Sequence, residues 1–149
     1  MRIRHVIGMF AVALTSASCS LGGAEDAGSM NVYLSVDKAT LFVNDTMTIT
    51  VTARNVGFDP VTLTGPSGCL LYVDVIDNLG NVHWSSNIGC GSQVVTEEIL
   101  AGVDKVQSFR WDGTNLAGGR LASGFYHVRG VARMTAGAYI GPPLSVTVE

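Results

Sequence analysis

The chain has 149 residues and a formal net charge of −3, so it suits one domain with an ordinary hydrophobic core and lacks the positive charge of nucleic-acid-binding proteins. Only 14% of its residues are charged and 18 are glycine, a composition typical of strands joined by turns rather than of helices.

The first 18 residues have the pattern of a secretory signal peptide. Arg2 and Arg4 form a short positive region, residues 6–14 are apolar, and small residues follow at positions 15–18. The apolar run is too short to span a bilayer, which takes about 20 residues. We therefore expect an exported protein. Loss of the two arginines with the leader would leave seven basic against twelve acidic residues, a net charge of −5.

Cys19 stands where a bacterial lipoprotein is acylated, directly after the small residues 16–18. The stretch resembles a lipobox, although Ser16 occupies a position where an aliphatic residue is usual. It would equally serve as an ordinary signal-peptidase site that gives a secreted protein. Three cysteines in an oxidising compartment leave one over. This parity favours a lipid on Cys19 and a disulfide between Cys69 and Cys90.

Residues 19–30 are rich in small side chains and show no apolar periodicity, so they are predicted to be a flexible tether for a domain at residues 31–149. Ser20 is not the aspartate that is associated with inner-membrane retention. The expected location is therefore the cell envelope, at the outer membrane if the cell is Gram-negative.

From residue 31 onward, short strand patterns alternate with turns. The clearest is at residues 46–53, where four threonines alternate with four apolar residues, so that one face points to a core and the other to solvent. No convincing amphipathic helix is present, and seven to nine short strands at this spacing predict an antiparallel β-sandwich. The other strands are predicted at residues 32–36, 61–64, 70–76, 82–84, 94–100, 106–111, 125–134 and 144–148.

A polar turn at residues 112–115 follows Trp111, and Gly124 then leads into a strand with Tyr126 just inside it. The turn contains Asp, Gly and Asn, which tolerate or promote turn geometry. A tyrosine near the start of a late strand resembles the tyrosine corner of immunoglobulin-like sandwiches. The expected fold class is therefore an all-β, immunoglobulin-like antiparallel sandwich, which can host many unrelated functions.

Two groups of residues form recognisable patterns: Tyr72, Asp74, Val75, Asp77, Gly80, Trp84 and Ser85, and then Phe109, Trp111, Asp112, Gly113, Gly119, Gly124 and Tyr126. Together they resemble the intracellular proteinase inhibitor (BsuPI) family over residues 40–132. The stretch from Trp111 to Val131 alone is also similar to the Ig-like domains of flagellar hook-capping proteins and of C-terminal sorting modules on secreted proteins. The resemblance implies a sandwich that inhibits a protease by binding it. The chain departs from the family in its export leader, since members are commonly cytosolic, and in Cys90.

Cys69 opens one predicted strand, and Cys90 lies in the loop beyond the next, at residues 85–91. Antiparallel return of the chain could bring their Cα atoms within about 4.4–6.8 Å, the range that a disulfide requires. Closing a loop of this length stabilises a fold by about 3 kcal/mol in the chain-entropy model. The bond would also fix residues 85–91 to the body of the domain.

Metal, cofactor and catalytic chemistry are not expected. The histidines beyond the leader are His83 and His127, and no Cys-x-x-Cys or His-x-x-x-His spacing is present for zinc. Asp74, Asp77 and Asn78 lack the glutamate of a calcium loop, and a hairpin turn explains them better. The sequence contains no nucleophile elbow, so we expect the protein not to be an enzyme.

Two connections, residues 85–91 and residues 135–143, are the candidate binding loops. The second is uncharged and stiffened by two prolines, so it could enter a protease cleft by strand addition. The alternative is that it packs its aromatic and aliphatic residues over the open end of the core. The candidate contact residues of the two loops are Ser85, Asn87, Ile88, Tyr139, Ile140 and Pro142.

These patterns favour an exported, non-enzymatic binding module that resembles a proteinase inhibitor and acts through rigid inter-strand loops. The expected partner is a protein, in the first place a protease. No nucleic acid, cofactor or metal is expected, and membrane contact is expected only through a lipid on Cys19. The alternative is a structural, assembly or adhesion module of a cell-envelope complex, with an exposed edge strand as its partner surface.

Overall fold

The computed structural model describes residues 29–135 and 137–149, which form eleven strands and one turn of 3₁₀-helix. The predicted signal peptide at residues 1–18, the lipidation site Cys19 and nearly all of the tether lie outside the described residues. Within the part that is described, no helix has the length and apolarity needed to cross a membrane. The expected all-β, immunoglobulin-like antiparallel fold is confirmed.

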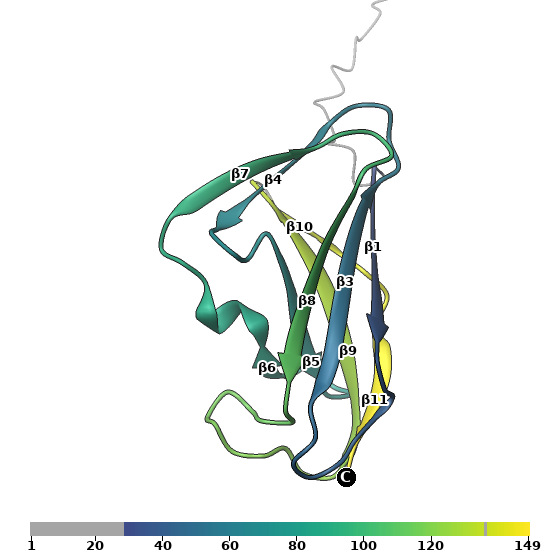
Figure 1. Ribbon diagram of the computed structural model, residues 1–149, viewed down its shortest axis with the longest axis vertical. Coiled ribbons are helices and arrows are strands. Elements are labelled where there is room, and N and C mark those ends of the chain that lie inside the picture. The colour runs from purple at the N-terminus through teal and green to yellow at the C-terminus, as the bar shows by residue number, and fades with distance from the viewer. Residues whose placement is uncertain (1–28, 136) are drawn as a thin grey trace, which may run out of the picture.

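Nine of the eleven strands pair into two sheets that face each other (Figure 1). The elements are β1 (Met30–Val36), β2 (Thr40–Leu41), β3 (Met47–Asn55), β4 (Val61–Pro66), β5 (Leu71–Ile76), β6 (Val82–Ser85), η1 (Ser86–Gly89), β7 (Val94–Ile99), β8 (Asp104–Trp111), β9 (Gly124–Met134), β10 (Gly137–Ile140) and β11 (Leu144–Val148). One sheet has the order β1-β3-β8, and the other has the order β2-β11-β9-β5-β6 with β10 also paired to β9. A separate ribbon joins β4 to β7.

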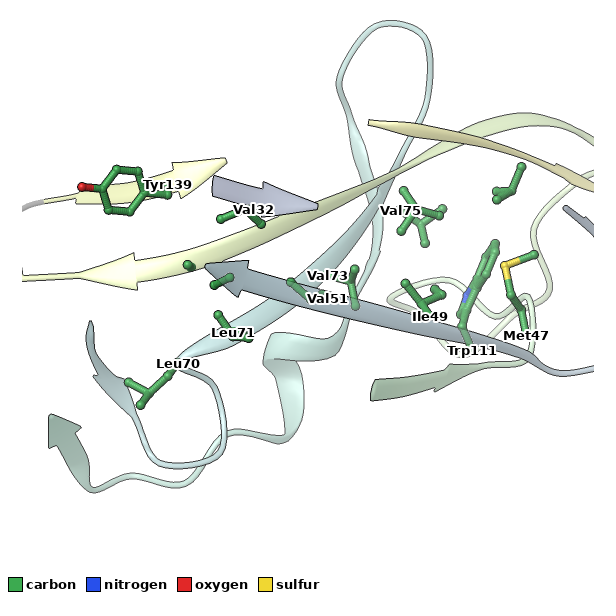
Figure 2. Close-up of a cluster of buried hydrophobic side chains, with 14 of the residues drawn as sticks. Val32, Met47, Ile49, Val51, Leu70, Leu71, Val73, Val75, Trp111 and Tyr139 are labelled. Atoms are coloured by element: carbon green, nitrogen blue, oxygen red, sulfur yellow. The ribbon is translucent and has the colours of Figure 1, made fainter. Parts of the chain in front are cut away.

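The core lies between the sheets and follows the alternation seen in the sequence. In β3 the apolar side chains are fully buried, while Thr48, Thr50 and Thr52 are partly exposed on the outer face. Figure 2 shows the buried row, with Met47 and Trp111 at one end and Tyr139 at the other. The core therefore runs the length of the sandwich and has an aromatic side chain near each end.

The connection between β8 and β9 contains the predicted tyrosine corner. The Tyr126 hydroxyl donates a hydrogen bond to the Ala122 carbonyl at 3.0 Å. Trp111 Nε1 donates to the Thr114 carbonyl at 2.9 Å, which ties the polar turn to the core. Gly113 has a φ of 83°, a left-handed conformation that favours glycine. The local chemistry of this segment was thus readable from the sequence.

Strands β4 to β7 form one long, bent hairpin. At its tip, Asp77 and Asn81 are joined by a backbone hydrogen bond of 3.1 Å, as expected for a turn at residues 77–81. Next to the tip β5 pairs with β6, and farther along the same arms β4 pairs with β7. The arms are irregular between these two ladders, at residues 67–70 and at η1.

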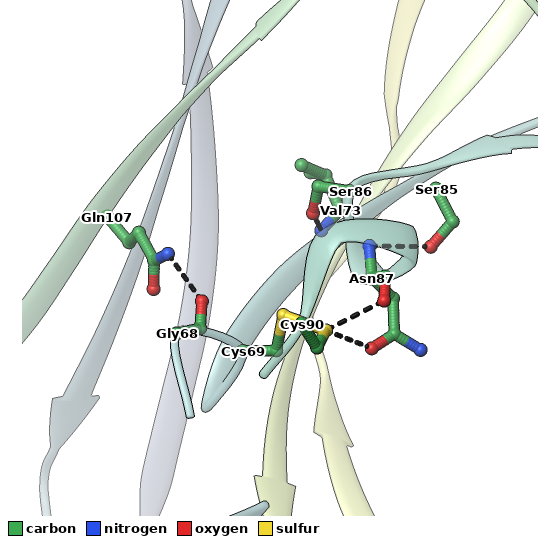
Figure 3. Close-up of a disulfide and its surroundings, with 8 residues drawn as sticks. All are labelled: Gly68, Cys69, Val73, Ser85, Ser86, Asn87, Cys90 and Gln107. Carbon is green, nitrogen blue, oxygen red and sulfur yellow. Dashed lines mark hydrogen bonds between the residues drawn. A yellow bond between two sulfur atoms is a disulfide. The ribbon is translucent and has the colours of Figure 1, made fainter. Parts of the chain in front are cut away.

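The predicted disulfide joins the two arms at this irregular point (Figure 3). The Cα atoms of Cys69 and Cys90 are 5.6 Å apart, inside the range required for the bond. Backbone bonds between Ser67 and Gln93 and between Gly91 and Ser67 continue the pairing beside it. The disulfide therefore fixes the β4–β7 ribbon to the rest of the hairpin.

Eleven strands exceed the expected seven to nine because two short strands, β2 and β10, add to the pattern. Strand β10 lies in the region that the sequence indicated to be a loop, residues 135–143. Ile140 pairs with Val131 and Leu144 pairs with Val128, so residues 141–143 lie opposite only residues 129–130. The predicted loop is therefore a hairpin turn, a strand and a β-bulge.

Candidate functional site

The first predicted binding loop, residues 85–91, is a rigid element. Ser86 Oγ accepts a hydrogen bond from the Val73 backbone nitrogen at 2.9 Å, and the disulfide at Cys90 fixes the far end of η1 (Figure 3). Ile88 is 66% exposed and is the apolar side chain that this element presents to solvent.

Ser85 and Asn87 support this loop from inside. Ser85 Oγ accepts a hydrogen bond of 3.3 Å from the Asn87 backbone nitrogen and caps η1. Two oxygens of Asn87 lie 2.7 and 2.8 Å from Cys90 Sγ. Oxidised sulfur carries no hydrogen, so these are contacts and not hydrogen bonds. The side chains of Ser85 and Asn87 are half-buried, so of the three candidate contact residues in this loop only Ile88 is exposed.

The second predicted loop separates its candidate residues. Tyr139 is buried, and its hydroxyl lies 3.2 Å from Ser29 Oγ, within hydrogen-bond distance. Ile140 and Pro142 are exposed. The alternation of β10 places adjacent side chains on opposite faces, so Tyr139 closes the core while Ile140 faces solvent. The alternative that the second loop covers the open end of the core therefore holds for Tyr139 and not for Ile140.

A hollow of about 550 Å³ lies beside Tyr139. Residues 57–62, from the β3–β4 connection and β4, line one side, and Met134 and Thr135 at the end of β9 line another. Phe58, one of the lining residues, is 99% exposed. Phe58 has the highest exposed fraction among the large hydrophobic side chains of the described surface, and it lies beside this hollow.

Asn55, at the end of β3, holds the connection that carries Phe58. Its side chain is 0% exposed, and its Oδ1 accepts a hydrogen bond of 2.9 Å from the Gly57 backbone nitrogen. Its Nδ2 donates to the carbonyls of Asp59 and Ile99, each at 2.8 Å. One buried amide thus binds the backbone on both sides of Phe58, and all of its bonds go to main-chain groups.

Two further segments brace the same connection. The Ser29 carbonyl accepts hydrogen bonds from the nitrogens of Val56 at 2.7 Å and Gly57 at 3.2 Å. The β7–β8 connection is tied to Asn55, whose backbone nitrogen donates to the Val103 carbonyl at 3.2 Å. We call this end of the sandwich, residues 29, 55–60 and 100–103, the Phe58 pole. Four of its large hydrophobic side chains are exposed: Val56, Phe58, Leu100 and Val103.

The acidic residues considered for calcium are occupied by protein partners. Asp74 accepts a 2.7 Å hydrogen bond from Arg129. Asp77 binds the backbone and side-chain nitrogens of Asn81, and these bonds, the side-chain one above all, lower the pKa of its carboxyl. Among residues 29–135 and 137–149, no group of three His, Cys, Asp or Glu side chains is placed to hold a metal ion.

One polar trio has the order of a nucleophile, a base and an orienting group. His127 Nδ1 lies 3.2 Å from Ser145 Oγ, and its Nε2 lies 2.9 Å from Asn78 Oδ1. Ser145 and His127 are directly paired across β11 and β9. The trio is solvent-exposed, and its residues are not among those that line the hollow at Phe58. We interpret it as a cross-strand polar contact.

Replacement of Asn55 by alanine is expected to lower the free energy of unfolding by about 2 kcal/mol, because three backbone groups lose a buried partner. Hydrogen exchange of the Gly57 amide should also accelerate. Chemical denaturation would measure the first effect. The matched control is Asn31→Ala on the exposed face of β1, which should change stability by no more than about 0.5 kcal/mol. Equal effects of the two substitutions would contradict the bracing role of Asn55.

The sequence analysis assigns no strand between residues 53 and 61 and does not identify the Phe58 pole. The sequence feature that could have indicated the pole is Phe58, an aromatic residue between Gly57 and the Asp59-Pro60 pair. Because its neighbours favour a turn at the surface, a large side chain at this position is not expected to reach the core. The exposure of Phe58 and the burial of Asn55 depend on how residue 29, residues 55–60 and residues 100–103 pack together, and these segments are distant in the sequence.

Comparison with known proteins shows the fold alone. No family model and no curated protein matches the sequence. A β-glucosidase of Erythrobacter marinus aligns with 81% of this chain at 12% identity and a TM-score of 0.50. An alkylpurine DNA glycosylase of Pseudomonas fluorescens, bound to DNA containing an abasic site analogue, aligns with 81% at 9% identity and a TM-score of 0.52. The chain spans only 15% and 30% of the length of these two enzymes.

A smaller protein also aligns with this chain. The CARDB domain of a Pyrococcus furiosus protein, in complex with di-metal ions, aligns with 80% of this chain and 87% of its own, at 16% identity and a TM-score of 0.48.

Proposed function

We propose that the protein is a non-enzymatic, exported binding module of the proteinase-inhibitor type, and that it binds its target through the Phe58 pole. The observation that carries this proposal is the bare Phe58 side chain on a connection whose flanking backbone is held by the buried Asn55 amide. A loop that is already ordered loses less conformational entropy on binding, so more of the contact energy becomes affinity. Exposed aromatic anchors dominate the energetics of protein interfaces.

Export rests on the leader pattern and agrees with the disulfide. A bond between Cys69 and Cys90 persists in an oxidising compartment such as the periplasm or the cell exterior. A lipid on Cys19 would anchor the module in the envelope. The target would then be an exported protease, which distinguishes this chain from commonly cytosolic members of the family that it resembles.

The direct test is inhibition of a panel of serine proteases by the purified, disulfide-bonded chain. We expect dose-dependent inhibition of at least one protease, with reduced and unfolded protein as the negative control. Absence of inhibition across the panel at high micromolar concentration would remove the inhibitor proposal. Mass spectrometry of native protein would show separately whether Cys19 carries a diacyl modification and whether Cys69 and Cys90 are oxidised.

A second candidate function, an assembly module of an envelope complex, is favoured by strand β8. Within the described chain β8 pairs only with β3, so its other edge is open to a partner strand. The edge is partly protected, because Gln107 donates to the Gly68 carbonyl at 2.9 Å and Lys105 forms an ion pair with Glu97. This candidate predicts capture of a specific envelope protein in a pull-down and no effect on proteolysis.

A further inference from the structure

We infer that Phe58 is the side chain that enters the primary specificity pocket of the target, and that the target is a serine endopeptidase whose pocket accepts a large aromatic residue. The peptide bond between Phe58 and Asp59 would lie at the protease's catalytic serine. This inference rests on the proposed inhibitor function and adds to it the reactive bond and the class of protease.

The first support is the arrangement of Asn55 around this bond. Asn55 Oδ1 binds the nitrogen of Gly57, one residue before Phe58, and Asn55 Nδ2 binds the carbonyl of Asp59, one residue after it. The Asn55 side-chain amide therefore bonds to the backbone on both sides of the Phe58–Asp59 peptide bond, while the Phe58 side chain is exposed to solvent. An inhibitor needs this combination, because the protease must reach the bond while the two halves of the loop stay in place.

The second support comes from the chain on each side of the bond. Before it, Val56 and Gly57 are bonded to the Ser29 carbonyl. Gly57 also lies so close to Ser29 that an added Cβ would be 2.8 Å from the Ser29 Cβ. After the bond, Pro60 fixes its own φ and leads directly into β4. Neither half of the loop can move away without breaking contacts with the domain.

The chemistry that follows is reversible. The protease serine would attack the Phe58 carbonyl carbon to form an ester, while the bond to the Asp59 nitrogen breaks and that amine takes a proton. Asn55 and Pro60 would keep the amine beside the ester. The amine can therefore attack the ester, release the serine hydroxyl and restore the peptide bond before water completes hydrolysis. Because the amine stays beside the ester, the peptide bond re-forms faster than it is hydrolysed, and the protease stays occupied by the chain.

Other exposed apolar residues fit this role less well. Leu79 is 88% exposed but sits in the tight turn at the hairpin tip, where its backbone nitrogen donates to Asp77 Oδ1 at 2.8 Å. Asp77 belongs to this turn and its side chain is 26% exposed, whereas Asn55 is fully buried and also bonds the Ile99 carbonyl of the domain body. Ile88, in η1, is 66% exposed and therefore presents less of its side chain than Phe58 does. Leu79 therefore serves as a matched control for Phe58.

The experiment measures inhibition by the full disulfide-bonded chain and three variants. We expect Phe58→Ala to weaken inhibition of an aromatic-preferring serine protease by about 30-fold or more. Phe58→Arg should lose that inhibition and gain inhibition of a protease that prefers arginine. Leu79→Ala should behave like the unchanged chain. Prolonged incubation with the protease should produce one cut, between Phe58 and Asp59, detectable by mass spectrometry.

Two results would overturn the inference in distinguishable ways. If the unchanged chain inhibits a protease and Phe58→Ala inhibits it equally well, Phe58 is not the anchor, although the inhibitor function stands. If the unchanged chain inhibits no serine protease, the proposed function fails and this inference fails with it. Thermal unfolding of each variant verifies folding, which substitution of a fully exposed side chain should not disturb.

Discussion

Replacement of Trp111 by alanine is expected to lower the free energy of unfolding by about 3–5 kcal/mol. Trp111 is 1% exposed and lies opposite Met47 at one end of the core (Figure 2). Its ring is 6.1 Å from that of Trp84, and its indole nitrogen holds the Thr114 carbonyl. Alanine would leave a cavity between the sheets and remove the bond that fixes the following turn.

Urea denaturation followed by circular dichroism would measure this loss. Phe125→Ala is the matched control, because Phe125 is also an aromatic strand residue but is exposed, and its removal should cost no more than about 0.5 kcal/mol. A loss below about 1 kcal/mol for Trp111→Ala would show that Trp111 does not close the core.

Removal of the disulfide by a paired Cys69→Ala and Cys90→Ala substitution is expected to lower stability by about 3 kcal/mol. The two cysteines are separated by 21 positions, and the chain-entropy model gives about this value for a loop of that length. The loss should appear also as faster hydrogen exchange in β4 and β7, because the bond fixes their ribbon to the hairpin.

Thermal or urea unfolding with and without a reductant would test this expectation. The unchanged chain should lose stability on reduction, whereas the paired variant should be insensitive to the reductant. A paired variant as stable as the oxidised chain would contradict the structural role of the bond. It would also weaken the argument from cysteine parity that assigns the remaining Cys19 to lipidation.

Much of the fold was predictable because its causes are local. The alternation at residues 46–53 predicts the buried face of β3, and the turn after Trp111 follows from residues that favour turns. The Tyr126 hydroxyl bond followed from the position of the tyrosine near the start of a late strand. The disulfide followed from the antiparallel return of a hairpin whose tip could be read from the sequence.

The proposed binding surface was harder to predict, because the exposure of Phe58 and the hydrogen bonds that hold its connection depend on segments distant in the sequence. Tyr139 and Ile140 are adjacent in an uncharged stretch, and only pairing with β9 decides which of them is buried. In the sequence, Asn55 is an ordinary turn-forming residue. Its structural role depends on the Ile99 carbonyl, more than forty positions away, which accepts a hydrogen bond from its amide. Side-chain patterns indicate which face of a strand is apolar, but they do not indicate which connections meet at an end of the sandwich.

The Phe58 pole and the carboxyl end of the chain lie at opposite ends of the sandwich (Figure 1). Glu149 is bonded to Leu41 and Arg120 beyond the far end of β3, whose nine residues span about 30 Å. A carrier, fluorophore or sensor chip coupled at Glu149 should therefore leave the loops of the pole unobstructed. Two copies joined tail to tail through this residue would face outward in opposite directions, a geometry suited to a bivalent reagent with enhanced avidity.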